Sequence, residues 1–184
     1  MSERLDIAII VGSLRARSYN RCFAEFIRSR YASSYRAEFA DIGVLPHYNQ
    51  DNELDPGPEV AAFKRQIAVA DGVVIVTPEF NWSIPGVLKN AIDWLSRVDK
   101  ALIGKPVMVA GVSGGSRGTL RAQLQLRQIL QSNGVNVKLL PPAGNEVLIG
   151  DAAQKFDETG ALVDQELIAY MDGVMKRFQE WIRS

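Results

Sequence analysis

Short, unbroken apolar segments alternate with longer amphipathic segments along most of the chain. The apolar runs are rich in Val and Ile without polar alternation, which is typical of strands buried on both faces of a parallel sheet. They predict strands over residues 5–11, 37–42, 72–77, 106–112 and 135–140. The amphipathic segments predict helices over residues 19–32, 57–70, 85–97, 119–132 and 164–183.

The regular alternation of strand and helix predicts a fold of the α/β class, with a helix layer on each face of one sheet. Right-handed crossovers leave few topologies for five parallel strands. We therefore predict a flavodoxin-like, three-layer αβα fold whose five-stranded parallel sheet has the order 2-1-3-4-5. Nothing in the sequence resembles a repeat or a linker, so one domain is expected over residues 1–184.

Charge composition argues against several classes of function. The chain has 21 acidic and 21 basic residues, so its formal net charge is zero. A general binder of nucleic acids or membrane surfaces would show a basic excess, and many small electron carriers are strongly acidic. The N-terminal segment does not resemble a signal peptide, and no apolar run approaches the ~18–20 residues of a membrane span. We expect a cytoplasmic protein with neither nucleic-acid nor membrane partners.

Cysteine and histidine are too few for most metal or triad chemistry. The chain contains one cysteine, Cys22, and one histidine, His47, which excludes an internal disulfide and a Cys/His zinc site. Cys22 falls in a predicted helix and is expected to be a small buried apolar residue. His47 lies in a Pro-flanked loop, and the chain lacks a G-x-S-x-G elbow. We therefore expect a turn at His47 and no catalytic triad.

Three unusual loops follow the first, third and fourth predicted strands. They are GSLRARSYN at residues 12–20, TPEFNWSIPG at 77–86 and SGGSRG at 113–118. In an open parallel sheet, ligands bind outside the carboxyl ends of the strands, where the strand order reverses. Because the predicted fold brings all three loops to that edge, we predict one ligand site there.

The first of these loops suits a phosphate group. Ser13, Arg15, Ser18 and Asn20 lie just before and inside a predicted helix, whose N-terminus offers unpaired N–H groups and a positive dipole end. An arginine fork adds a charged donor. The loop has neither a Walker G-K-[ST] nor a G-x-G-x-x-G pattern. One alternative stays open, in which Ser18 is simply an N-cap and the arginines are solvated.

The other two loops suit a planar ring. Pro78, Glu79, Phe80 and Asn81 supply backbone amides, one charge and one aromatic face, and the glycines of the 113–118 loop allow close backbone approach. A monophosphate and a planar ring together describe FMN. The 113–118 loop could equally be a turn whose following helix is capped by Ser116 or Thr119.

Several residues of the 77–97 segment have structural alternatives. Glu79 could anchor the loop in place of donating a proton, and Trp82 could belong to the core or to a subunit contact. Lys89 and Asp93 are expected on a solvated or subunit-facing side of the helix.

The motifs G-S-L-R-x-x-S-Y-N, T-P-E-F-N-x-S-x-P-G-x-L-K-N-A-I-D-W and G-K-P-V resemble those of the NADPH-dependent FMN reductase family, which includes bacterial chromate and quinone reductases. The resemblance covers residues 5–140. It implies a flavodoxin-like fold, bound FMN and a homodimer that can pair further into a homotetramer. It also implies the site residues. Those for the FMN phosphate are Ser13, Arg15, Ser18, Tyr19 and Asn20; those for the ring are Pro78, Glu79, Phe80, Asn81, Ser113, Gly114, Gly115 and Gly118.

The chain departs from the family pattern at two places. The family usually has tyrosine where Phe80 stands, so a contact through that hydroxyl is lost. Members close to the chromate reductases carry Tyr-His where this chain has Leu124 and Gln125. This second difference affects the expected tetramer contact and the substrate preference, and it leaves the FMN prediction unchanged.

The resemblance implies a ping-pong oxidoreductase. NADPH or NADH passes a hydride to the flavin, and an acceptor then takes its place; the acceptor is free flavin, a quinone, an azo dye or a metal oxyanion such as chromate. Arg15, Arg17 and Arg117 are candidates to meet the dinucleotide phosphates. Two other classes stay open: a flavodoxin-type electron carrier without its own NADPH activity, and a non-enzymatic scaffold with a decayed site.

Overall fold

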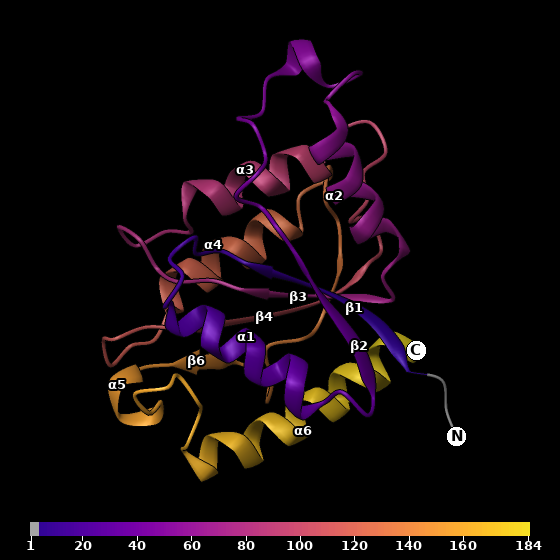
Figure 1. The fold of residues 1–184 in the computed structure, drawn as a ribbon. Helices are drawn as coiled ribbons and strands as arrows, with labels where there is room; N and C mark the ends of the chain where they lie inside the picture. Colours follow the sequence, from indigo (N-terminus) through magenta and orange to yellow (C-terminus); the bar gives the residue numbers. More distant parts are fainter. Residues whose placement is uncertain (1–3) are drawn as a thin grey trace.

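The computed structural model describes residues 4–184 and has a central sheet with helices on both faces (Figure 1). The strands are β1 (Leu5–Val11), β2 (Tyr35–Ala40), β3 (Gly72–Val76), β4 (Pro106–Val112), β5 (Lys138–Leu139) and β6 (Val147–Ile149). The α-helices are α1 (Tyr19–Arg30), α2 (Pro58–Val69), α3 (Gly86–Leu95), α4 (Leu120–Leu130), α5 (Ala152–Lys155) and α6 (Gln165–Arg183), and Gln50–Asn52 forms a 3-10 turn.

The sheet confirms the predicted strand order. Its path is β2-β1-β3-β4-β5, and every strand pair is parallel. The chain moves outward from β1 to β2 and then returns to place β3 on the other side of β1, so the order reverses between β1 and β3. Val11 is in register with Val76, and Val76 with Ala110. The loops that follow β1, β3 and β4 therefore start at the same edge of the sheet.

The predicted fifth strand, over residues 135–140, is wrong in extent. Only Lys138–Leu139 pairs with the start of β4, and β6 then continues along the same side of β4 by pairing with its last three residues. Pro141 and Pro142 lie between these two strands and lack the N–H group that a sheet ladder needs. The fifth position of the sheet is consequently split in two, and the sheet has six strands among the described residues.

The second strand and the helix ends differ from the prediction by a few residues. β2 begins at Tyr35 and ends at Ala40, two residues earlier than expected at each end. Tyr35 is buried, and its hydroxyl donates a 2.7 Å hydrogen bond to the carbonyl of Met175 in α6. This tertiary contact, which a local pattern does not contain, holds the start of the strand.

Two apolar cores lie on opposite faces of the sheet. Alternate residues of each central strand face opposite sides, as Ile9 and Ile10 of β1 do. The first core packs the sheet against α1 and α6, and the second packs it against α2, α3 and α4 (Figure 1). Because both faces of the sheet are covered, the central strands read as unbroken apolar runs. No helix within residues 4–184 is long and apolar enough to cross a membrane.

Candidate functional site

A cavity of about 380 Å³ opens at the edge of the sheet where β1, β3 and β4 end. Its walls are formed by Ser13, Arg15, Ser18, Tyr19, Asn20, Pro78, Glu79, Phe80, Val112, Ser113 and Gly114. Ten of these eleven residues are among the thirteen predicted from the sequence; Val112 is the addition. Asn81, Gly115 and Gly118 do not line the cavity. The three loops therefore do converge on one hollow, as the fold predicted.

The N-terminus of α1 forms one end of the cavity. Ser18 is the N-cap, and its side-chain oxygen accepts a hydrogen bond from the backbone N–H of Asn20 at 3.3 Å. The first turn of α1 contains no acidic residue, so the positive end of the helix dipole is not neutralised from within the helix. Ser18 is thus an N-cap, as the alternative reading held, and it is also part of the cavity wall.

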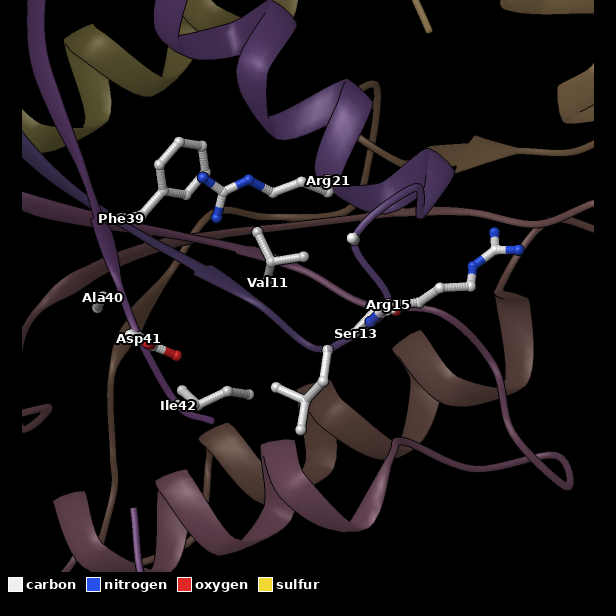
Figure 2. A pocket seen from close by; sticks show the side chains of 10 residues that line it. Val11, Ser13, Arg15, Arg21, Phe39, Ala40, Asp41 and Ile42 are labelled. Atoms are coloured by element: carbon white, nitrogen blue, oxygen red, sulfur yellow. Dashed lines mark hydrogen bonds between the residues drawn. The ribbon is translucent and has the colours of Figure 1, made fainter. Parts of the chain in front are cut away.

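Arg15 adds a positive charge beside that helix end. Its side chain is exposed, and among residues 4–184 its guanidinium has no hydrogen-bonding or ion-pair partner. Figure 2 shows this side chain reaching away from the end of β2. An uncompensated guanidinium next to an uncompensated helix N-terminus is an arrangement that favours a bound anion.

Asn20 ties the first loop to the third. Its side-chain amide donates to the carbonyl of Val112 at 2.9 Å, and its side-chain oxygen accepts from the N–H of Val112 at 2.9 Å. Asn20 is almost fully buried. The amide nitrogen and oxygen of Asn20 both bond to the backbone at the end of β4. The structural role of Asn20 is therefore to hold α1 against the start of the third loop.

Glu79 anchors the second loop to α4. Its carboxylate accepts hydrogen bonds from the backbone N–H groups of Arg121 at 2.9 Å and Ala122 at 3.2 Å, and the Arg121 guanidinium lies 3.5 Å away. The side chain is only 15% exposed. Thr119, a predicted cap of this helix, makes no capping bond, since Glu79 satisfies the helix end from another loop. This geometry matches the structural alternative for Glu79.

Replacing Glu79 by alanine should lower the free energy of unfolding by about 2 kcal/mol, because two partly buried N–H groups of α4 lose a charged acceptor. Glu79→Gln keeps an acceptor oxygen and should lose less than half of that amount. Urea denaturation followed by circular dichroism measures both changes. Lys89→Ala is the control, because it removes an exposed ion pair with Asp93 and should change stability little. A Glu79→Ala variant as stable as Lys89→Ala would contradict the anchoring role.

The tip of the second loop is a tight turn. Phe80 and Ser83 exchange two backbone hydrogen bonds of 2.9 Å, and Asn81 and Trp82 between them have positive φ angles of 51° and 65°. Trp82 is 68% exposed, so the alternative that placed it in the core is wrong. Its ring instead lies against the Arg121 guanidinium, 4.4 Å from the centroid. Asn81 serves the turn, which explains its absence from the cavity wall.

β6 supports the third loop, a contribution that sequence reasoning missed. The N–H of Ser113 donates to the carbonyl of Ile149 at 2.8 Å. Gly118 has a φ of 60° and packs directly on the backbone of Leu148, so its lack of a side chain serves that packing and not the cavity. At Gly114, in contrast, an added Cβ would meet no atom within 4 Å. The backbone at Gly114 is therefore open to a ligand in the cavity.

The remaining sequence candidates lie outside the cavity. His47 is exposed, in a segment held by Asn90 through Pro46 and Tyr48. Cys22 is only partly buried, less than predicted. Lys89 and Asp93 form a partly exposed 2.6 Å ion pair within α3. The described residues contain no group of three or more His, Cys, Asp or Glu that could hold a metal ion.

The fold and the cavity define an α/β protein with a positively charged cavity end and an open backbone at Gly114, at the switch point of a flavodoxin-like sheet. Residues 5–154 match the family described as NADPH-dependent FMN reductase. The chain therefore belongs to that family and is an oxidoreductase with flavin-linked chemistry.

Similar proteins with named activities support the assignment. A 2-hydroxy-1,4-benzoquinone reductase from a Burkholderia species is 42% identical, over 97% of each chain. An NAD(P)H-dependent FMN reductase from Pseudomonas aeruginosa is 38% identical, over 100% of this chain and 98% of its own. Among solved structures, the flavoenzyme FerB from Paracoccus denitrificans, an NAD(P)H:(acceptor) oxidoreductase, has a TM-score of 0.87 and 32% identity, with 97% of each chain covered.

Proposed function

We propose that this protein is an FMN-dependent NAD(P)H oxidoreductase that reduces a small-molecule acceptor of the quinone or flavin class. The observation that carries the proposal is the cavity at the β1/β3 switch point, where an uncompensated helix N-terminus and Arg15 lie beside an open backbone slot. Family membership and the quinone and FMN reductases among its relatives support the same activity.

The residues at the first loop suit the FMN phosphate. Ser13 and Ser18 offer hydroxyl groups, Arg15 offers a charged fork, and the first turn of α1 offers N–H groups that no acidic side chain competes for. Tyr19 completes the wall. Asn20 fixes the position of these groups relative to the third loop through its two hydrogen bonds to the backbone of Val112.

The second and third loops suit the flavin ring. Pro78, Phe80, Ser113 and Gly114 all line the same cavity. Bound FMN supplies the hydride chemistry. The chain itself positions the ring: Glu79 fixes the second loop on α4, and β6 fixes the third. Gly115, Gly118 and Asn81 act behind this surface, by shaping the two loops.

We propose that the acceptor meets the ring from the open side, beside the 53% exposed side chain of Phe80. The apolar Phe80 rim suits a flat, apolar acceptor such as a quinone better than a small oxyanion. We also propose a cytoplasmic homodimer that can form a homotetramer, and one domain over residues 1–184.

The decisive experiment records the visible spectrum of the purified protein after FMN is added and excess is removed, and then adds NADPH without air. A retained flavin spectrum that bleaches within seconds supports the reductase. A retained flavin that does not bleach would instead favour an electron carrier that depends on a partner. Loss of the flavin on desalting would mean that FMN is at most a diffusing substrate, and the prosthetic-group proposal would fail.

A further inference from the structure

A second cavity, of about 500 Å³, lies on the other side of the first loop (Figure 2). It is bounded by the ends of β1 and β2, by α1 and by the loop residues that follow β1. Its lining residues are Val11, Ser13, Leu14, Arg15, Ala16, Arg21, Phe39, Ala40, Asp41 and Ile42. Only Ser13 and Arg15 also line the proposed flavin cavity, so the loop at 13–16 is a wall that the two cavities share.

Arg21 forms a flat, fixed platform at this second cavity. Its guanidinium lies over the ring of Phe39, 3.5 Å from the centroid. Its Nε and Nη2 atoms both donate to Glu25, at 3.2 and 3.0 Å, which fixes the plane of the fork. A guanidinium held flat in this way stacks well on an aromatic ring. The platform therefore suits the base of a nucleotide.

The floor and the far side of the cavity complete a nucleoside site. Val11, Ala40 and Ile42 give an apolar floor, and the 57% exposed Leu14 gives an apolar wall. Asp41 is exposed, and one of its oxygens accepts from the N–H of Gly43 at 2.8 Å. Its second oxygen is available to the hydroxyls of a ribose, a role that acidic residues after the second strand of dinucleotide-binding sheets commonly have. A site for phosphate alone would need neither the apolar floor nor the carboxylate.

We propose that this second cavity receives the adenosine end of the nicotinamide dinucleotide, with the base on Arg21 and the ribose at Asp41. The inference rests on the proposed function, because it places the remote end of the same hydride donor. Figure 2 shows that Arg15 extends from the shared loop away from the second cavity. The phosphates that join the two halves of the dinucleotide would then cross this loop beside Arg15.

The chain offers a matched pair of variants. Arg21 and Arg28 both lie on α1, pair with Glu25 and approach the Phe39 ring, and their side chains are 42% and 45% exposed. Only Arg21 lines the cavity. Arg21→Ala and Arg28→Ala should therefore have similar effects on folding, and only Arg21→Ala should affect the nucleotide.

The kinetic test compares NADPH with 1-benzyl-1,4-dihydronicotinamide, a hydride donor that lacks the adenosine end. Arg21→Ala should raise the KM for NADPH by roughly fivefold to tenfold, as expected for the loss of one stacked cation. The rate with the truncated donor and the affinity for FMN should not change. Arg28→Ala should match the unaltered protein with both donors. Equal effects of Arg21→Ala on both donors, or no effect on either, would overturn the adenosine site.

A binding test does not depend on turnover. The FMN-loaded protein is titrated with 5′-AMP and with 2′,5′-ADP by calorimetry, and each is then tested as an inhibitor. Binding that Arg21→Ala weakens, Arg28→Ala retains and NADPH displaces supports the proposal. Binding that is not competitive with NADPH would mean a separate nucleotide site and would refute it. If neither donor reduces the flavin of the unaltered protein, the proposed function fails. If reduction is normal and Arg21→Ala leaves the KM for NADPH unchanged, only the adenosine site fails.

Discussion

Asn20→Ala is expected to lower the free energy of unfolding by about 3 kcal/mol and to weaken FMN binding at least about tenfold. The side chain makes two 2.9 Å hydrogen bonds to the backbone of Val112, and both ends of that contact are buried. Alanine leaves the N–H and carbonyl of Val112 without partners away from water. It also releases the N-terminus of α1 from the third loop, so the two halves of the proposed cofactor site lose their fixed separation.

Asn90→Ala is the matched control for this variant. Asn90 also clamps backbone groups with both sides of its amide, accepting from the N–H of Tyr48 at 2.7 Å and donating to the carbonyl of Pro46 at 2.9 Å. It lies outside the proposed flavin cavity. Chemical denaturation should show a loss of stability in both variants, whereas a flavin fluorescence titration should show weaker FMN binding only in Asn20→Ala. Equal FMN affinities in the two variants would remove Asn20 from the account of the site.

Gly111→Ala is expected to destabilise the protein by about 3 kcal/mol or more, enough to reduce its soluble yield sharply. Gly111 is inside β4, where an added Cβ would overlap the hydroxyl of Thr119 and the backbone carbonyl of Thr77. Both threonines are fully buried. Thr77, at the start of the second loop, and Thr119, at the start of α4, can approach the sheet closely only because Gly111 has no side chain. Neither neighbour can retreat without moving one of those segments.

Gly86→Ala provides the comparison for a glycine that the packing does not require. Gly86 begins α3, and an added Cβ there would meet no atom within 4 Å. Alanine should be neutral or slightly stabilising at that position, by less than about 1 kcal/mol. Thermal denaturation of both variants gives the test. If Gly111→Ala and Gly86→Ala had the same melting temperature, the start of α4 would be able to shift easily.

The sequence predicted the order of the sheet because that order depends on features that are local in the chain. Unbroken Val and Ile runs mark the strands at 5–11, 72–77 and 106–112, and the helices between them force parallel crossovers. The ligand edge follows from the same reasoning, since all three unusual loops come after strands of one sheet. Ten predicted site residues therefore meet in one cavity.

What the sequence could not provide depends on contacts between distant segments. β6 has only three residues, and its pairing with β4 is visible only in three dimensions. The partner of Glu79 lies 42 residues further along the chain, so a loop carboxylate and a helix cap cannot be told apart by spacing. Gly111 looked like an ordinary strand residue, although a glycine inside a strand is itself a sign of close backbone approach.

The fifth position of the sheet is divided between β5 and β6, and residues 141–144 lie between the two strands. Residues 141–144 between β5 and β6 are exposed, while the third loop is held beyond them by the bond from Ser113 to Ile149. The carbonyls of residues 141–143 accept hydrogen bonds from Asn145, and the carbonyl of Gly144 accepts one from Arg177, so this exposed segment is itself held in place. We expect a change of length there to disturb these bonds first, while the pairing of β6 with β4 keeps the ligand edge of the sheet in place.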